Sequence, residues 1–222
     1  MLNKEPSARQ FKDEAYGAFA AVVKAMGNPR RLEVLDLLVQ RPLRVDAVAA
    51  GVGQSVANTS QHLQVLRRAG LVVRRARGTS AVYAVAVGVP EALVALRRLA
   101  EARSAELLAA KQAYFGGAGS AEVIAADALR EGLEAGDVVL VDVRPAEEFA
   151  DGHVPGARSL PVGELGDRLH ELPTSKLIVA TCRGPYCTFA ADAVRVLRAS
   201  GRRAVRFEHG VAEWRADGGE VV

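Results

Sequence analysis

Apolar residues recur every three or four positions at the start of the chain and predict two amphipathic helices. Between residues 15 and 26 they follow this spacing and Gly27 comes next, so a first helix is expected to end there. Asn28 then caps a second helix, because its side chain can accept a hydrogen bond from a free N–H of the first turn. Pro29 stands at the first helical position, where proline is favoured.

The polar positions that follow predict a helix with a DNA-facing side. A short helix over residues 46–50 and a glycine-containing turn lead to Ser55, which caps a helix over residues 56–69. Val56, Leu63 and Leu66 are expected to point inward. Amides, hydroxyls and a guanidinium remain outside, and such groups read base edges and phosphates in a major groove. The residues expected to contact DNA here are Ser55, Asn58, Thr59, Gln61, Gln64 and Arg68.

A basic hairpin is predicted directly after this helix. Gly70 ends the helix, and residues 71–74 and 81–85 alternate as two strands around a loop at residues 75–80. Arginines cluster on this hairpin, where they suit contacts with phosphates or with the minor groove. The arginines expected to bind DNA are Arg74, Arg75 and Arg77. Helix-turn-helix and hairpin together predict a winged helix.

Residues 91–114 are expected to form one long helix. Its 24 residues would span roughly 36 Å at 1.5 Å per residue. Apolar residues alternate steps of three and four along it, interrupted by Arg103, as in helices that pack against another helix. We expect this helix to mediate homodimerisation, although packing against its own domain would give a similar pattern.

The segments NPRRLEVLDLL and SVANTSQHLQVLRRAGLVVRRARGTSAVYAV resemble the ArsR/SmtB class of bacterial winged-helix repressors, and the likeness extends over residues 11–115. The resemblance implies a homodimer that binds operator DNA and leaves it when a ligand or a thiol reaction changes the dimer. The arsenic-responsive branch of the class carries paired cysteines before the recognition helix. Residues 43–48 hold no cysteine, so metal or arsenite sensing is not expected here.

The second half of the chain alternates short apolar strands with helices. Strands are expected over residues 138–141, 177–180 and 204–207, and a helix over residues 188–199. Such alternation favours a parallel sheet covered by helices. We therefore expect two domains: a mainly α winged helix-turn-helix over residues 1–115 and an α/β domain with a parallel sheet flanked by helices over residues 121–222. A glycine-rich linker over residues 116–120 is expected to join them.

A cysteine stands where a predicted strand meets a predicted helix. Cys182 follows the strand over residues 177–180, and a helix N-terminus at that place stabilises a thiolate. Pro185 has no N–H, so a loop curled around this sulfur would offer other backbone donors. The donors expected are the amides of Arg183, Gly184, Tyr186, Cys187 and Thr188. The side chain of Arg183 is expected to add positive charge for an anionic sulfur donor.

The segments DVRPAEEF at residues 142–149, GHVPGA at residues 152–157 and GVAEW at residues 210–214 resemble the rhodanese family together with this loop. The resemblance implies that Cys182 takes sulfur from thiosulfate, a polysulfide or a persulfide, holds it as a persulfide and passes it to a thiol acceptor. Asp142 and Arg144 would support this chemistry, or would form a buried ion pair that only holds the strand end. No cofactor and no metal are implied.

The loop departs from the usual rhodanese pattern in two positions. Glycine comes two residues after Cys182 rather than three, and Cys187 stands in the fifth position, where an arginine is common. Ordinary thiosulfate turnover is less favoured for this reason. Cys187 is a candidate for resolving a persulfide or sulfenate on Cys182 into a disulfide or a sulfur-bridged link. The alternative is that Cys187 is a small buried residue without a chemical role.

Charge separates the two halves. Residues 1–115 carry 17 lysines and arginines against 9 acids, or +8, and residues 116–222 carry 12 against 17, or −5. A basic first half agrees with a polyanionic partner such as double-stranded DNA. Two cysteines exclude a disulfide scaffold, four scattered histidines offer no metal spacing, and no apolar run is long enough for a membrane span. No secretory signal is evident, and a cytoplasmic location is expected.

Two functions remain open. The first is a transcriptional repressor whose DNA affinity changes when Cys182 carries a persulfide. The signal would then have to cross residues 116–120 and act on residues 91–114, and a flexible linker transmits poorly. The second is a rhodanese-type thiosulfate sulfurtransferase with an appended DNA-binding domain. A third and weaker reading, in which the first domain is only a dimerisation scaffold, disagrees with the arginines of the predicted wing.

Overall fold

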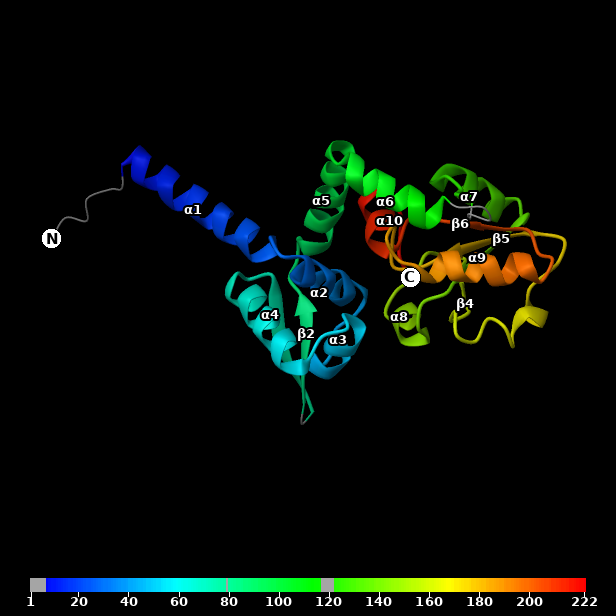
Figure 1. Cartoon of the computed structure of the whole chain (residues 1–222), viewed down its shortest axis with the longest axis horizontal. Helices are drawn as coiled ribbons and strands as arrows, with labels where there is room; N and C mark the ends of the chain where they lie inside the picture. Colours follow the sequence, from blue (N-terminus) through cyan, green and yellow to red (C-terminus); the bar gives the residue numbers. More distant parts are fainter. Residues whose placement is uncertain (1–6, 79, 117–121) are drawn as a thin grey trace. The chain divides into compact units, whose positions relative to one another are not determined.

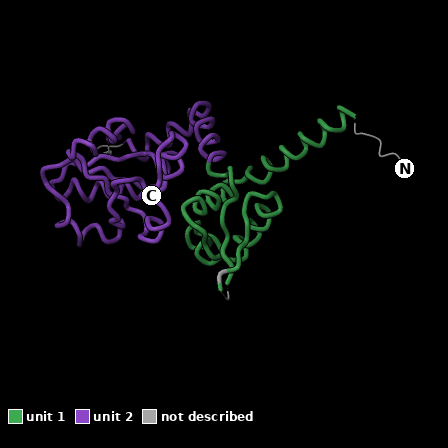
Figure 2. The backbone as a smooth tube through the Cα atoms, turned by 180° about the vertical axis from the view of Figure 1, so that it is seen from behind, with its two compact units in different colours: residues 1–90 green, residues 91–222 purple. Residues whose placement is uncertain are grey.

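The computed structural model describes residues 7–78, 80–116 and 122–222, and the chain divides into two compact units (Figures 1 and 2). The first unit is Met1–Pro90 and the second is Glu91–Val222. The predicted linker at residues 116–120 lies, apart from Gly116, outside the described residues. Within the described part of the chain, no helix is long and apolar enough to cross a membrane.

The first unit is a winged helix-turn-helix, as predicted. Two of its helices begin where the local signals indicated. The Asn28 side chain accepts a hydrogen bond from the N–H of Arg31 at the start of one helix, and the Ser55 side chain accepts one from the N–H of Asn58 at the start of another. Gly70 has φ of 74°, the left-handed conformation that follows a helix end. The elements are α1 Ala8–Met26, α2 Pro29–Gln40, α3 Val45–Gly51, α4 Val56–Arg68, β1 Val72–Arg77 and β2 Ser80–Val85.

The core of this unit lies between α2, α3 and α4, where leucines and valines are almost fully buried. Its members include Val34, Leu35, Leu38, Val48, Leu63 and Leu66. The wing is an antiparallel pair in which Val72 is opposite Val85, and Leu43 adds a bridge to Tyr83. The predicted loop at residues 75–80 was too long, because pairing continues to Arg77 opposite Ser80. Gly78, with φ of 61°, provides the backbone conformation that so tight a hairpin needs.

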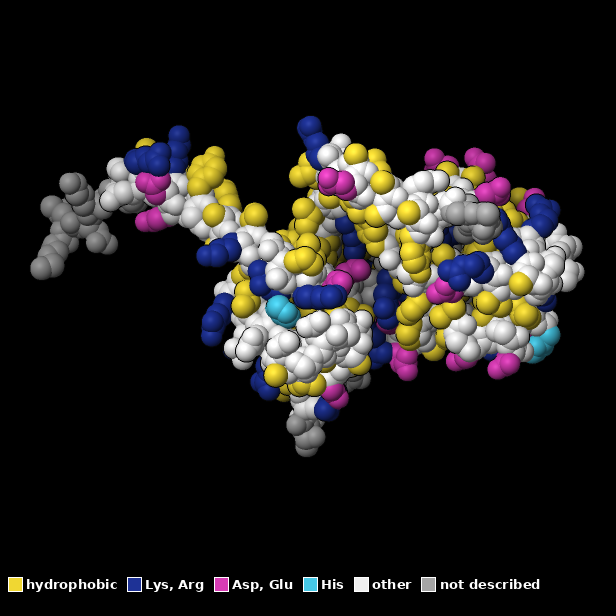
Figure 3. Space-filling view, in the orientation of Figure 1, with side chains coloured by type: hydrophobic (Ala, Val, Ile, Leu, Met, Phe, Trp, Pro, Cys, Tyr) yellow, Lys and Arg dark blue, Asp and Glu magenta, His cyan; other side chains and the backbone are white. Residues whose placement is uncertain are grey.

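Helix α1 forms as predicted, but its apolar side chains are not covered. Phe11, Tyr16, Phe19 and Val23 are each more than 60% exposed, whereas Ala25 is buried. Figure 3 shows hydrophobic side chains in yellow on the surface of this helix. An exposed apolar row of this size on one helix is typical of an interaction surface.

The single helix expected over residues 91–114 is instead two helices, α5 Val89–Arg103 and α6 Ala105–Phe115. Ser104 breaks the chain direction with φ of −110° and ψ of 103°, and its hydroxyl accepts a hydrogen bond from the N–H of Leu107. Serine competes for backbone groups in this way and begins a new helix. From Glu91 onward both helices belong to the second compact unit, together with the α/β domain.

The second unit is built on a four-stranded parallel sheet. The strands are β3 Val138–Asp142, β4 Arg158–Ser159, β5 Leu177–Thr181 and β6 Ala204–Arg206, in the order β4-β3-β5-β6. The prediction of a parallel sheet is confirmed, and the two-residue strand β4 is an addition to it. The remaining elements are α7 Ala126–Glu134, α8 Ala146–Ala150, the 3₁₀ turn η1 Leu169–Glu171, α9 Phe189–Ala199 and α10 Val211–Ala216.

Each face of this sheet has its own apolar layer, because alternate strand residues point to opposite sides. Val141, Ile178 and Ala180 share one buried cluster with Val194 and Leu197 of α9. Leu140 and Val179 share the other with Leu129 of α7 and Trp214 of α10. Helices on both faces leave the carboxyl ends of β3 and β5 side by side, with Asp142 opposite Thr181. Reactive groups collect at this edge in parallel sheets, and Cys182 follows there.

Candidate functional site

The predicted DNA-reading helix α4 presents a polar outer face in the first unit. The side chains of Asn58, Gln61, Gln64 and Arg68 are exposed. Ser55 is exposed too, but its hydroxyl is bonded to the N–H of Asn58. These five residues therefore occupy positions where they can meet a nucleic acid.

Thr59 does not belong to this surface. It is 0% exposed, so the prediction that it faces outward was wrong. Thr59, Leu63 and Leu66 are four and three residues apart and form one inward stripe of the helix. Val56, expected inside, continues this stripe toward the N-terminus but is 50% exposed, because it is the first residue of the helix. Within the described part of the chain the hydroxyl of Thr59 has no hydrogen-bond partner.

The wing carries exposed arginines as expected. Arg74 and Arg75 on β1 are exposed, and neither takes part in an ion pair among residues 7–78, 80–116 and 122–222. Of Arg77 only the backbone, at the end of β1, is described. Two guanidinium groups without acidic partners beside the polar face of α4 suit phosphate contacts.

The second candidate site is the loop between β5 and α9, which contains both cysteines of the chain. The Cys182 side chain is 3% exposed and Cys187 is half-buried. Sγ of Cys182 lies 3.6 Å from the carbonyl oxygen of Cys187 and 3.8 Å from that of Gly184. Gly184 has φ of 147°, a conformation that favours glycine and that lets the loop turn around the sulfur.

The two thiols differ in acidity. Burial raises the pKa of Cys182 well above its ordinary value, and the neighbouring Cys187 raises it further. A hydrogen bond from Cys182 lowers the pKa of Cys187 to about 7, with help from the backbone N–H groups of Arg183 and Phe189 and the charge of Arg183. At neutral pH the loop therefore holds a protonated Cys182 thiol beside a partly ionised Cys187.

The backbone donors around the sulfurs agree only in part with the set that the sequence predicted. The N–H groups of Gly184 and Ala190 lower the pKa of Cys182, and those of Arg183 and Phe189 lower the pKa of Cys187. Of these four amides, Gly184 and Arg183 were expected. The N–H of Cys187 is bonded to the carbonyl oxygen of Gly184 over 3.1 Å. Thr188 stands at the N-cap of α9, where its carbonyl accepts from the N–H of Asp192 and its side chain makes no capping bond.

Arg183 lies beside the loop but is already paired. Its Nε and Nη2 reach the carboxylate of Glu148 over 2.9 Å and 2.5 Å, and its guanidinium lies 5.1 Å from the ring centre of Phe189. Glu148 is 4% exposed, so the bidentate pair is largely removed from water. Arg183 thus holds the loop to α8 as well as supplying positive charge beside Cys187.

Asp142 and Arg144 form a buried ion pair at the end of β3. Both are 1% exposed, and Nη2 of Arg144 lies 2.6 Å from Oδ2 of Asp142 and 2.8 Å from the carbonyl oxygen of Gly152. The pair fixes the turn from β3 toward residues 145–152. His153, whose ring is stacked on Phe149 at 3.6 Å, helps to fold the same turn.

Tyr186 connects the loop to helix α5. Its hydroxyl donates a hydrogen bond to Oε1 of Glu101 over 2.9 Å, and burial together with this bond raises the pKa of Tyr186. Arg97 of the same helix pairs with Glu213 of α10, whose other oxygen accepts from the N–H of Gly210.

Sequence reasoning missed the carboxylates that surround the loop, namely Glu101, Glu148 and Glu213. They are 85, 35 and 29 positions from their loop neighbours Tyr186, Arg183 and Gly184. Spacing along the chain carries no signal for such pairs. A hint existed only in Glu148 and Glu213, which lie within the segments that resemble the rhodanese family.

Comparison with known proteins assigns a family to each half. Residues 28–73 match the arsR family of bacterial regulatory proteins, and residues 125–217 match the rhodanese-like domain. Across almost the whole length, the chain is 44% identical over 200 residues to the HTH-type transcriptional regulator Rv0324 of Mycobacterium tuberculosis. That alignment covers 90% of this chain and 88% of the relative. A sulfurtransferase of Allochromatium vinosum is 31% identical over 86 residues, covering 39% of this chain and 79% of the relative.

Solved structures resemble the halves separately. The homodimeric winged helix-turn-helix DNA-binding domain of Mb0332 from Mycobacterium bovis is 33% identical, covers 45% of this chain and 92% of its own, and has a TM-score of 0.41. A rhodanese-related protein from Thermoplasma volcanium is 27% identical, covers 46% of this chain and 97% of its own, and also has a TM-score of 0.41.

Proposed function

Since this chain belongs to the arsR family of bacterial helix-turn-helix regulators and carries a rhodanese-like domain after its DNA-binding unit, we propose that it is a transcriptional repressor that responds to sulfane sulfur. In this proposal Cys182 takes up a sulfur atom as a persulfide, and the modified loop changes the affinity of the dimer for operator DNA. The observation that carries the proposal is the thiol pair in the loop at the carboxyl end of β5.

Cys187 is well placed to activate Cys182. The hydrogen bond between the two thiols and the lowered pKa of Cys187, about 7, make the Cys187 thiolate a proton acceptor next to the buried Cys182 thiol. When the proton moves to Cys187, the Cys182 thiolate attacks the outer sulfur of thiosulfate. The sulfur–sulfur bond of thiosulfate breaks, sulfite leaves with the electron pair, and Cys182 keeps the transferred sulfur as a persulfide.

The same two residues can complete a second step. After the proton passes to the outer sulfur of the persulfide, the Cys187 thiolate attacks Sγ of Cys182 and hydrosulfide leaves. The product is a disulfide between Cys182 and Cys187, and no further oxidant is consumed. In the absence of this step, a thiol acceptor attacks the outer sulfur and carries it away.

Operator binding is proposed for a homodimer. Leu96 and Leu99 of α5 and Leu108 and Tyr114 of α6 are between 38% and 59% exposed, which agrees with a helix pair covered by a second copy. The exposed apolar row of α1 needs a cover for the same reason. Two copies related by a twofold axis would present two α4 helices to successive major grooves of a pseudo-palindromic operator.

The test is a mobility shift with a DNA fragment selected from a random library by the reduced protein. We expect sodium polysulfide to change the affinity of the parent for this fragment and to leave Cys182→Ser unresponsive. Cys187→Ser should load sulfur more slowly, because the proton acceptor is gone. Equal responses of Cys182→Ser and the parent would remove the sensor role.

A sulfurtransferase enzyme is the second candidate. It is favoured by the relative from Allochromatium vinosum, whose printed name is sulfurtransferase. In this case the DNA-binding unit controls only where the enzyme acts or how its operon is expressed. Steady turnover of thiosulfate and cyanide to thiocyanate and sulfite should then exceed the uncatalysed rate by orders of magnitude and disappear in Cys182→Ala, with DNA binding unchanged. Negligible turnover would favour the sensor.

A further inference from the structure

The cysteine loop is bonded to helices α5 and α6 through side chains, without use of residues 117–121. Tyr186 donates to Glu101 of α5 over 2.9 Å. Nζ of Lys111 on α6 lies 3.2 Å from the same carboxylate oxygen and 5.9 Å from the centre of the Tyr186 ring. The loop, α5 and α6 therefore meet at one carboxylate within the second unit.

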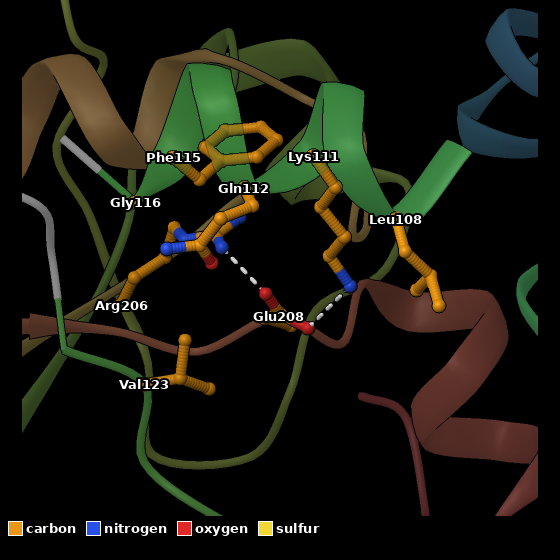
Figure 4. A pocket seen from close by; sticks show the side chains of 8 residues that line it. All are labelled: Leu108, Lys111, Gln112, Phe115, Gly116, Val123, Arg206 and Glu208. Atoms are coloured by element: carbon orange, nitrogen blue, oxygen red, sulfur yellow. Dashed lines mark hydrogen bonds and ion pairs between the residues drawn. The ribbon is translucent and has the colours of Figure 1, made fainter. Parts of the chain in front are cut away.

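The contacts continue from Lys111 and return to the loop. Lys111 donates to Oε2 of Glu208 over 2.9 Å, and the other oxygen of Glu208 pairs with Arg206 at the end of β6 (Figure 4). Nη1 of Arg206 lies 3.5 Å from the carbonyl oxygen of Pro185, the neighbour of Tyr186 in the chain. These contacts form a closed circuit, here called the loop ring. Its members are Tyr186, Glu101, Lys111, Glu208, Arg206 and Pro185.

The loop ring is electrically balanced and partly shielded from water. Its two carboxylates face two cations, and the exposed fractions of the charged side chains run from 3% for Arg206 to 28% for Glu101. Although burial lowers it, Glu208 and Glu101 together raise the pKa of Lys111 above its ordinary value, so the lysine stays charged. Such pairs are less screened by salt than pairs on an open surface.

The loop ring also borders a hollow. Leu108, Gln112 and Phe115 of α6 line a pocket of about 490 Å³ together with Arg206 and Glu208 (Figure 4). Beside it, the guanidinium of Arg206 lies 4.1 Å from the centre of the Phe115 ring. In this region α6 is held to the sheet by charged and stacked side chains around open space, and such contacts can be exchanged without opening an apolar core.

Sulfur uptake has to disturb this arrangement. Cys182 is 3% exposed and belongs to the buried cluster of β5 and α9, so a persulfide adds an atom where little room exists. Close-packed interiors accommodate an added atom by shifting the atoms around it. The loop of residues 183–187 bends around this sulfur, and it carries the Tyr186 hydroxyl and the Pro185 carbonyl oxygen.

We propose that Glu101 and Lys111 are positioning residues that pass the state of the cysteine loop to helices α5 and α6 through the loop ring. The proposal rests on the proposed sulfur response and deepens it by naming the route. Helix α5 begins at Val89 in the DNA-binding unit and continues into the second unit, so movement of α5 reaches the DNA-binding unit along one continuous helix. The residues of the predicted linker are not needed as transmitters.

The experiment compares operator affinity before and after polysulfide treatment in the full chain. The DNA probe is the fragment selected by the reduced parent, and the treated protein is checked by mass for sulfur on Cys182. We expect the parent affinity to change by a factor in the range of roughly 5 to 150 that is typical of coupled sites. In Glu101→Ala this factor should fall toward 1, while sulfur loading and the affinity of the reduced protein stay near those of the parent.

Arg98→Ala is the matched control, because it removes another cation of α5 whose ion pair, with Asp217 directly after α10, is not a contact of the loop ring. It should respond as the parent does. Tyr186→Phe should reproduce the loss, and combining it with Glu101→Ala should add nothing. If Glu101→Ala does not fold, Lys111→Met serves in its place, since it also opens the loop ring.

Failure of the route through the loop ring and failure of the sulfur response give different results. If Glu101→Ala and Lys111→Met change their operator affinity as much as the parent does, the route through the loop ring is overturned and the proposed sulfur response remains. A parent that loads sulfur without any change in affinity would overturn the proposed function and the route with it. Loss of the response in Arg98→Ala as well as in Glu101→Ala would show that any weakening of α5 is sufficient, which also overturns the specific role of the loop ring.

Discussion

Sγ of Cys182 lies 3.6 Å from the carbonyl oxygen of Cys187, and the two thiols of this loop share a hydrogen bond that makes them unequal. The buried thiol is the donor and the half-buried one is the more acidic. A rhodanese loop normally relies on its backbone amides and an arginine. Here the second cysteine acts in the opposite direction to an arginine, because Cys187 raises the pKa of Cys182.

The difference in pKa between Cys182 and Cys187 predicts that an alkylating reagent modifies them at different rates. Iodoacetamide should modify Cys187 first, with a rate that rises through pH 6 to 8 and is half-maximal near its pKa of about 7. Cys182 should react slowly over this range, because it is 3% exposed and its pKa is raised. Peptide mass spectrometry after timed labelling distinguishes the two sites.

Cys182→Ala provides the decisive comparison for that profile. The hydrogen bond from Cys182 is the largest cause that lowers the pKa of Cys187, so its removal should move the half-maximal pH upward, toward the ordinary value of 9.0. The Cys182→Ser variant retains a donor and should shift less. An unchanged profile in Cys182→Ala would contradict the shared hydrogen bond.

Thr59 offers a test of the corrected DNA surface. Because its buried hydroxyl has no partner among the described residues, Thr59→Val should stabilise the protein by about 1 kcal/mol. Operator affinity should not change, since the side chain is 0% exposed. Thermal unfolding and mobility shifts measure both quantities.

Asn58→Ala is the counterpart, because Asn58 lies on the exposed face of the same helix. It should weaken operator binding by roughly 1–3 kcal/mol if the amide reads a base edge, with little change in stability. If Thr59→Val loses DNA binding and Asn58→Ala binds DNA as the parent does, the sequence prediction that Thr59 contacts DNA would be restored.

Local signals account for most of what the sequence predicted correctly. Asn28, Ser55 and Gly70 act within one turn of the helices that they begin or end, so their neighbours in sequence are also their partners in space. Ser104 carried a similar signal as an N-cap. It was overlooked because the apolar repeat on both sides of it matched one continuous helix.

The parts that sequence could not predict depend on contacts between distant segments. Glu101 and Tyr186 are 85 residues apart, and Arg97 and Glu213 are 116 apart. Neither pair follows from periodicity, because its geometry depends on how α5 lies against the α/β domain within the second unit. The inward position of Thr59 has a different origin, since a hydroxyl is expected outside until the packed neighbours Leu63 and Leu66 define the buried stripe.

The buried pair of Asp142 and Arg144 should matter for stability more than for chemistry. Each side chain is 1–2% exposed, so Asp142→Ala leaves a buried guanidinium with reduced compensation. We expect a loss of about 3–5 kcal/mol in the free energy of unfolding, measured with urea. The folded fraction of the variant should still take up sulfur on Cys182, as the parent does. A stable variant that fails to load sulfur would instead support a direct role in catalysis.

The wing arginines predict a salt dependence that separates DNA binding from a scaffold role. Each phosphate contact releases counterions and contributes about −0.9 to the slope of log affinity against log salt concentration. Arg75→Ala should therefore weaken binding to all sequences alike and make the slope shallower by about one unit, because Arg75 is exposed on β1 and lacks an acidic partner among the described residues. Arg195→Ala changes the net charge equally but removes an arginine paired with Asp192 on α9, so its slope should match the parent. A flat salt dependence in the parent would favour the scaffold, whereas equal slopes for Arg75→Ala and Arg195→Ala would place the phosphate contacts elsewhere.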